Sequence, residues 1–318
     1  MDVILHLGVH RTATTTLQMY LARNAMSLAR AGVVVWTPDR TRAGLFAGLL
    51  QRPEDTTLLD ERQAQRSLGV IAVEMERLAQ SGIRRLIVSE ENMLGGLRNN
   101  LRERRLYPLS GERMRRFRAA FGHRLRGIAL SIRSHDGYWS SALAYAVAQG
   151  MAVPSAAQIA ALADAPHSWR AVLTEIAAIF PGVPLTVWPF ESFAGRPDAQ
   201  LDLLDPGLRL INATGGSDRL NPSPGRDKLR TLMRLRGTDG AIPHLPQADG
   251  RWIPFDAAAQ DRLRKRYVAD LDWLAAGADG LAQWVEKVHK GNDKTGEGRH
   301  ASAPPDGGYD RERERQMV

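Results

Sequence analysis

Short apolar runs alternate along the chain with longer stretches in which apolar residues recur every three or four positions. The short runs predict strands, because a strand buried on both faces of a parallel sheet is almost continuously apolar. They cover residues 3–7, 33–36, 85–89, 128–132 and 184–188. The longer stretches have the periodicity of helices. They cover residues 14–31, 61–81, 111–121, 138–148, 155–163, 168–180, 226–236 and 256–276.

This alternation of strands and helices predicts an α/β protein. We expect a three-layer open parallel β-sheet flanked by helices, because parallel strands need long crossovers that cover the sheet. A single domain covers residues 1–290, with a helical insert at about residues 150–180 and helices near its C-terminal end. Residues 291–318 are polar and rich in Gly and Pro, which predicts a disordered tail. Ligands of such sheets bind beyond the carboxyl ends of the strands.

Composition excludes several classes of chemistry. The chain has 318 residues, 43% of them hydrophobic, and it has no Cys. The absence of Cys excludes thiol catalysis, disulfides and zinc sites built on Cys. No spacing of His, Asp and Glu predicts a metal site. We find no pattern of a signal peptide and no run apolar enough for a membrane span, so we expect a cytoplasmic protein.

The net charge of +8 also constrains the partners. Only five of the 43 basic residues are Lys, and none of these precedes position 228. A bias toward Arg along the whole chain is a weak sign of nucleic-acid binding, which we do not expect. An acidic small ligand such as a nucleotide accounts for a basic cleft equally well. The basic segment 98–126 fits either an anionic acceptor such as a glycan or a solvated surface.

The loop after the first strand predicts a phosphate site. It reads Gly-Val-His-Arg-Thr-Ala-Thr-Thr-Thr-Leu over residues 8–17 and leads directly into a helix. Backbone N–H groups and the positive end of a helix dipole meet there, which suits a phosphate. The candidate binding residues are Gly8, His10, Arg11, Thr12, Ala13, Thr14, Thr15 and Thr16. The alternative is that one of these threonines only caps the helix.

A second candidate anion site follows the fourth strand. Arg133 stands at the end of that strand, and Ser141 lies eight residues later in the next helix. A guanidinium matches the geometry of a phosphate dianion, and a hydroxyl completes its shell. The alternative is an Arg at the sheet edge and a Ser on a helix face.

The first loop resembles the 5′-phosphosulfate loop of the sulfotransferases that use 3′-phosphoadenosine 5′-phosphosulfate (PAPS). The pattern of that family is close to Gly-x-x-Lys-Thr-Gly-Thr-Thr-x-Leu. Matching positions are Gly8, Thr12, Thr14, Thr15 and Leu17, whereas Arg11 replaces the Lys and Ala13 replaces the Gly. The pair Arg133 and Ser141 is similar to the family's 3′-phosphate element. The resemblance implies a P-loop NTPase-like fold, PAPS as donor with its bisphosphate product PAP, and no required metal.

Transfer of a sulfuryl group also needs a base for the acceptor proton. Family members place a His or a Glu near the end of the strand beside the first, so the resemblance makes Glu90 our candidate base and Glu91 the reserve. Arg11 is the candidate that neutralises the leaving oxygen. The alternative for the two acids is a helix N-terminus or an ion pair with the Arg-rich segment. We expect His6 to pack in the core.

The expected function is therefore transfer of a sulfuryl group from PAPS to a hydroxyl or amine, on a small-molecule or glycan acceptor. A P-loop nucleotide kinase or NTPase is one alternative, but the first loop lacks the second Gly followed by Lys and Ser or Thr of a Walker A motif. The other alternative is a nucleotide- or polyanion-binding protein without catalysis. Nothing in the sequence indicates the oligomeric state.

Overall fold

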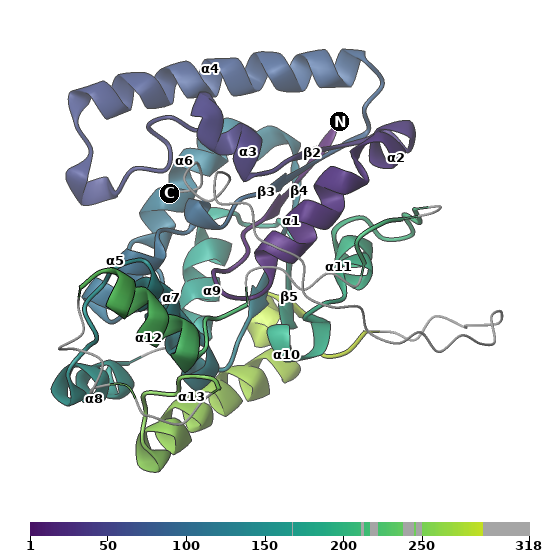
Figure 1. Cartoon of the computed structure of the whole chain (residues 1–318). Helices are drawn as coiled ribbons and strands as arrows, with labels where there is room; N and C mark the ends of the chain where they lie inside the picture. The colour runs from purple at the N-terminus through teal and green to yellow at the C-terminus, as the bar shows by residue number, and fades with distance from the viewer. Residues whose placement is uncertain (167, 211–212, 217–221, 238–244, 246–249, 289–318) are drawn as a thin grey trace. The chain divides into compact units, whose positions relative to one another are not determined.

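A single parallel sheet organises the part of the chain that the computed structural model describes, namely residues 1–166, 168–210, 213–216, 222–237, 245 and 250–288. In these residues the strands are β1 (Asp2–His6), β2 (Val33–Trp36), β3 (Arg85–Ser89), β4 (Leu125–Ile132), β5 (Leu185–Pro189) and β6 (Gln283–Trp284). Their order is β2-β3-β1-β4-β5-β6, and every neighbouring pair is parallel (Figure 1). The five predicted strands are confirmed, and β6 is an additional short one.

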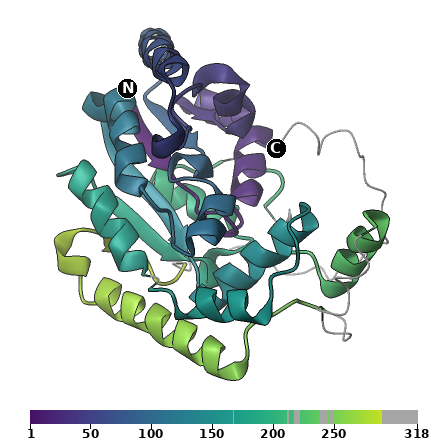
Figure 2. The same cartoon turned by 90° about the vertical axis from the view of Figure 1, so that its left-hand side faces the viewer.

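Helices cover both faces of the sheet, which confirms the α/β class and the layered architecture (Figures 1 and 2). The described helices are α1 (Thr14–Arg23), α2 (Ala25–Arg30), α3 (Pro38–Arg40), α4 (Leu58–Gln80), α5 (Leu97–Glu103), α6 (Ser110–Phe121), α7 (His135–Ala148), α8 (Ala156–Asp164), α9 (Trp169–Ile179), α10 (Phe190–Phe193), α11 (Pro197–Leu204), α12 (Arg226–Leu235) and α13 (Ala257–Ala275). Helices α8 and α9 lie in the segment expected as an insert, and α9 packs on the core through Leu173 and Ile176. No helix in the described part of the chain is long and apolar enough to span a membrane.

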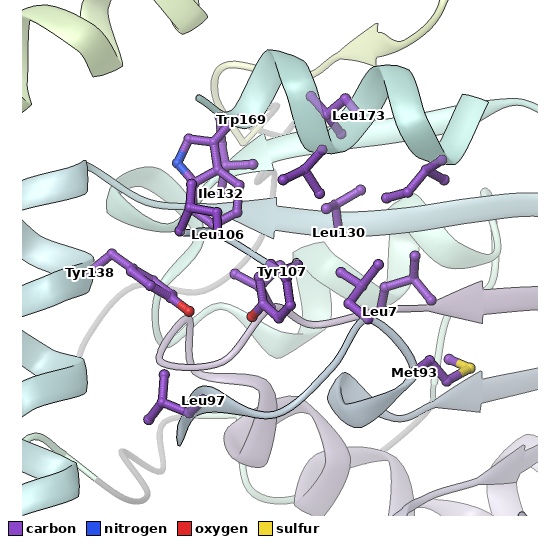
Figure 3. Packing of buried hydrophobic residues seen from close by; sticks show 14 of the residues in the cluster. Leu7, Met93, Leu97, Leu106, Tyr107, Leu130, Ile132, Tyr138, Trp169 and Leu173 are labelled. Carbon is purple, nitrogen blue, oxygen red and sulfur yellow. The ribbon is translucent and has the colours of Figure 1, made fainter. Parts of the chain in front are cut away.

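The core forms because successive strand residues point to opposite faces of the sheet. In β1, Leu5 belongs to a large buried cluster with Phe117 of α6 and Leu173 of α9. Its neighbour Ile4 belongs to a second cluster with Leu17 of α1. Figure 3 shows the first cluster at the carboxyl end of the sheet, where Leu7 lies near the rings of aromatic residues. The two clusters hold the strand ends, and therefore the loops that follow them, in fixed positions.

The helix predicted over residues 14–31 is wrong in one respect, because it breaks at Asn24 into α1 and α2. The Asn24 side-chain amide donates to the Tyr20 carbonyl at 2.7 Å, and its oxygen accepts from the Thr214 amide at 3.1 Å. A side chain that bonds to its own backbone competes with the helix. The bond to a residue so distant in the sequence could not be foreseen.

Short helices are the other elements that the sequence did not indicate. Helices α3, α5, α10 and α11 have only three to eight residues. Such segments are too short to display a helical period of apolar residues. The tail predicted over residues 291–318, and residues 289–290 of the predicted domain, lie outside the described residues.

Candidate functional site

The carboxyl ends of β1 and β4 mark the crevice of this sheet. The chain leaves β1 toward β2 on one side and leaves β4 toward β5 on the other. Ligands of open parallel sheets bind at such a change of direction. The predicted phosphate loop follows β1 and the predicted Arg133 follows β4, and the two strands are direct neighbours. The topology therefore brings the two candidate elements to one edge of the sheet.

The loop between β1 and α1 folds tightly around its own backbone. Gly8 has a φ of 88°, and a Cβ there would lie 2.8 Å from the Cβ of Glu91, so only glycine fits. The hydroxyls of Thr12 and Thr14 both donate to the Val9 carbonyl, at 2.7 and 2.8 Å. These two side chains are buried and stabilise the shape of the loop. Their hydroxyl protons point into the loop.

The backbone of the loop offers the remaining donors. Ala13 stands before α1 with a φ of 62°, and its carbonyl accepts from the Thr16 amide at 3.0 Å. The first amides of a helix have no partner within the helix, so those of Thr14 and Thr15 are suited to an anion. The His10 amide differs, because it donates to the Tyr107 hydroxyl at 2.9 Å. For an anion, this loop therefore offers the amides of the helix end more than the His10 amide or the hydroxyls of Thr12 and Thr14.

Arg11 joins the first predicted element to the second. Its Nε donates to the Ser141 hydroxyl at 2.9 Å, and its guanidinium lies 4.9 Å from the centre of the Tyr145 ring. Its Nη2 also donates to the Ser223 hydroxyl at 3.3 Å. Burial lowers the pKa of the Arg11 guanidinium, although it keeps its charge at neutral pH. Both Arg11 and Ser141 were predicted, whereas Ser223 was missed.

Arg133 approaches the same loop from the end of β4. Its Nη1 donates to the Arg11 carbonyl at 2.7 Å, and its guanidinium stacks 4.3 Å from the centre of the Phe190 ring. The pKa of Arg133 is lowered to about 10, first by burial and then by the positive charges of Arg251 and Arg11, against the acid of Glu191. Three guanidinium groups thus converge, and an anion between them would relieve their repulsion.

Arg251 is a site residue that sequence reasoning missed. It is exposed, and its Nη2 donates to the Gly137 carbonyl in the first turn of α7 at 3.1 Å. Arg251 is 114 residues from Gly137 in the sequence and belongs to no strand. A backbone bridge between residues 225 and 251 supports it. No spacing within the chain signals this contact.

Glu90 is engaged in an ion pair at the end of β3. The side chain is fully buried, and its two oxygens accept from the Thr41 hydroxyl at 2.6 Å and from Arg42 at 2.7 and 3.0 Å. The Asn92 amide also donates to it at 3.0 Å. The two bonds from Arg42 match the ion-pair alternative, although Arg42 lies outside the segment expected to supply the partner. The bond from the Asn92 amide matches the other alternative, because Glu90 caps the short helix Glu91–Met93. A role for Glu90 as a base stays a prediction.

Glu91 lies closer to the loop. Its Oε2 accepts from Gln18 of α1 at 2.9 Å, and its Oε1 accepts from Arg42 at 2.9 Å. Burial raises the pKa of Glu91, but His10, Arg42 and Gln18 outweigh it, so the net pKa is lowered. The side chain of Glu91 is 16% exposed, whereas that of Glu90 is not exposed at all. The carboxylate of Glu91 is therefore ionised at neutral pH and within reach of a molecule at the loop.

The histidines near the site are held by neighbours. The Nδ1 of His10 lies 3.0 Å from the Tyr107 hydroxyl and its Nε2 lies 3.1 Å from the Asn92 oxygen. Burial lowers the pKa of His10, so the ring is neutral at neutral pH. His6 is buried, bonds to Ser89 at 2.8 Å and stacks on a Trp, which confirms its expected place in the core.

No protein-family model, no curated protein and no solved structure matches the chain. In the described residues no group of three or more His, Asp and Glu side chains could hold a metal ion. What the site offers chemically is a helix N-terminus, three converging Arg side chains and one partly exposed Glu side chain. Such a set suits a ligand with more than one anionic group.

Proposed function

We propose that this protein is a sulfotransferase that binds PAPS beyond the ends of β1 and β4. The observation that carries the proposal is the junction of the two predicted anion elements. Arg133 donates to the Arg11 carbonyl and Arg11 donates to Ser141, so the two elements are in direct contact. A nucleotide with anionic groups at its 3′ and 5′ ends needs two cationic sites near each other.

In this proposal each element of the site has one task. The amides at the start of α1 and the Arg11 guanidinium bind the 5′-phosphosulfate end. Arg133, Arg251 and Ser141 bind the 3′-phosphate. Arg11 exchanges its bond to Ser141 for one to the oxygen between phosphorus and sulfur, and it stabilises the charge that develops there.

The reaction itself is an in-line displacement. The acceptor oxygen or nitrogen forms a bond to sulfur while the bond from sulfur to the bridging oxygen breaks, and the bisphosphate leaves with the electron pair. A carboxylate, which we take to be Glu91 or Glu90, accepts the acceptor proton. The geometry favours Glu91, because its side chain is partly exposed and lies against Gly8 of the loop.

Calorimetric titration with adenosine 3′,5′-bisphosphate tests the nucleotide site. We expect binding that weakens about tenfold to a hundredfold in Arg133→Ala, because a charge-assisted contact to phosphate is lost. Adenosine 5′-monophosphate lacks the 3′-phosphate, so it should bind weakly to the native protein and with the same affinity to this variant. Arg98→Ala is the matched control, since Arg98 is exposed and has no bonding partner in the described residues. Absence of heat with the bisphosphate would refute the proposal.

Transfer of radiolabelled sulfate from PAPS to a panel of phenols, amines and glycans tests the catalysis. We expect transfer without added metal, and we expect Arg11→Ala to abolish it while the bisphosphate still binds. Binding without transfer to any acceptor would favour the non-catalytic alternative. Dependence on Mg²⁺ with transfer of phosphate from ATP would favour the kinase alternative.

A further inference from the structure

The segment that joins α5 to α6 has a strained backbone. Three of its residues have a positive φ although none is glycine, and they are Arg104 (49°), Tyr107 (43°) and Leu109 (61°). Such a conformation is unfavourable for a bulky residue, and it persists only where the surrounding structure fixes it. Of the three, Tyr107 alone is buried. The contacts of Tyr107 are therefore the place to look for what this strain achieves.

The Tyr107 hydroxyl contacts the loop that follows β1. It accepts a hydrogen bond from the His10 amide at 2.9 Å, and it lies 3.0 Å from the Nδ1 of the His10 ring. The two rings also stack, with their centres 5.9 Å apart. One hydroxyl therefore restrains both the backbone and the ring of a loop residue that is 97 positions away in the sequence.

The partners of the His10 ring determine which of its nitrogens carries the proton. Its Nε2 lies 3.1 Å from the side-chain oxygen of Asn92, which can only accept, so the proton is on Nε2. Burial lowers the pKa of His10, so the ring is neutral at neutral pH and its Nδ1 is an acceptor. The Tyr107 hydroxyl therefore donates its proton to Nδ1 while its oxygen accepts from the His10 amide.

Two further side chains hold Tyr107 in place. The Asn100 side-chain oxygen accepts from the Tyr107 amide at 3.1 Å, and its NH₂ group donates to the Tyr138 hydroxyl at 2.7 Å. Figure 3 shows the hydroxyls of Tyr107 and Tyr138 pointing toward one another. All three residues are buried. A buried polar network whose members all have partners is rigid, so the Tyr107 hydroxyl has a fixed position.

The loop after β1 needs a restraint from outside. Arg11 and Ala13 have φ values of 64° and 62°, which are unfavourable for residues with a Cβ. A loop in this conformation would sample others if nothing held it, and ordering it again when a ligand binds would reduce the affinity. The Arg11 guanidinium and the first amides of α1 both depend on the conformation of this loop.

A buried tyrosine needs only one partner to satisfy its hydroxyl. Here the hydroxyl engages two groups of one loop residue, and a strained backbone brings it there. We propose that Tyr107 is a positioning residue of the anion site, which acts through His10 to hold the loop of residues 8–13 in its binding conformation. This inference rests on the proposed function, because it takes the loop to bind the 5′ end of the nucleotide.

The variant Tyr107→Phe tests the inference, because it removes the hydroxyl and keeps the ring. We expect the His10 amide to exchange its hydrogen at least about tenfold faster, since it loses its acceptor. The ¹⁵N signal of the His10 Nδ1 should move toward that of an unbonded acceptor nitrogen. In calorimetry the affinity for adenosine 3′,5′-bisphosphate should fall about tenfold. Saturating bisphosphate should slow the His10 amide of the variant again, because the ligand then orders the loop.

Tyr20→Phe is the matched control. Tyr20 is a buried residue of α1 whose hydroxyl has no hydrogen bond within the described part of the chain, so this variant should match the native protein in all these measurements. Circular dichroism verifies the fold. If Tyr107→Phe does not fold, His10→Phe removes the ring bond instead, and it should weaken bisphosphate binding at least about threefold.

The outcomes separate this inference from the proposed function. A native protein that does not bind the bisphosphate would refute the proposed function, and the inference would fall with it. If the native protein binds and Tyr107→Phe binds equally well, the inference alone is overturned. This holds even if the His10 amide exchanges faster in the variant, because Tyr107 would then have only a structural role.

Discussion

Ala13 has a backbone conformation that a residue with a Cβ adopts at a cost. Its φ is 62°, and its helix α1 begins at the next residue. A left-handed conformation costs a non-glycine residue about 1 kcal/mol. Alanine loses less backbone entropy than glycine on folding, so the two effects nearly cancel. We expect Ala13→Gly to leave the free energy of unfolding unchanged or to raise it by up to about 1 kcal/mol. Urea denaturation measures this change.

Ala160→Gly is the matched control for that prediction. Ala160 is exposed in the interior of α8, where its conformation is helical. The same substitution there should lower the free energy of unfolding by about 1 kcal/mol. If both variants lost equal stability, the left-handed conformation of Ala13 would carry no measurable cost and the prediction would be wrong.

Glu90 and Glu91 differ in how far their carboxyl groups are committed to structure. Glu90→Gln would set an amide NH₂ against the donors of Thr41 and Arg42, so we expect a loss of about 2–3 kcal/mol of stability. Glu91→Gln should cost less, and it should lower kcat by about a hundredfold or more if Glu91 is the base. Denaturation curves and transfer rates of the two variants separate the roles. Native stability combined with lost transfer in Glu90→Gln would reverse the assignment.

Asp270 connects three elements through one carboxylate. It is buried on α13 and accepts from His135 of α7 at 3.0 Å and from the Trp169 amide of α9 at 2.8 Å. It also accepts from the Ser168 hydroxyl at 2.8 Å and from the Arg170 amide at 3.2 Å. The N-terminus of α9 is therefore stabilised by an acid from a distant helix, which suits the helix dipole.

Asp270→Asn should disrupt this connection, because an amide NH₂ replaces one of the accepting oxygens. We expect a loss of about 2–3 kcal/mol in the free energy of unfolding. Relative to the native protein, the variant should exchange amide hydrogens faster in the first turn of α9. Exchange in α4, which is remote from Asp270, should change less. Uniform acceleration along both helices would mean that the effect is global and not local to the cap.

The whole molecule should lose stability in mild acid because of His6. Burial lowers the pKa of this ring to about 4, despite the opposing charge of Glu91. An unfolded His has a pKa of about 6.5. Between pH 4 and about 6.5 the His6 ring of the unfolded chain binds a proton, whereas the buried ring of the folded chain does not. The free energy of unfolding should therefore fall as the pH drops from about 6.5 to 4, by about 3 kcal/mol from this residue alone.

The variant His6→Phe checks this contribution. Phenylalanine keeps an aromatic ring against the neighbouring Trp188 and cannot take up a proton. Urea denaturation at pH 7, 6, 5 and 4.5 should give a smaller decline for the variant than for the native protein. The other titrating groups act equally in both proteins, so the difference in slope belongs to His6. Parallel slopes would contradict the prediction.

The strands, the long helices and the loop at residues 8–17 could be recognised from the sequence because each is a local property. An apolar run, a period of 3.6 residues or a cluster of hydroxyls before a helix can be seen without knowing what packs against it. The same holds for Arg133 and Ser141, since their spacing follows from one strand and one helix. The residues predicted for the two anion sites do lie at neighbouring strand ends.

Contacts between distant segments could not be foreseen in this way. Arg42 occupies both oxygens of Glu90, Thr214 bonds to the break at Asn24, and Arg251 reaches the first turn of α7. In each case the partners are separated by 48 residues or more, so only the folded chain brings them together. A polar side chain satisfies its bonds with whatever the packing supplies, and packing depends on all the elements at once. For this reason the sequence could indicate which residues are suited to bind an anion. Only the tertiary structure decided which of these side chains are already bonded to other parts of the chain.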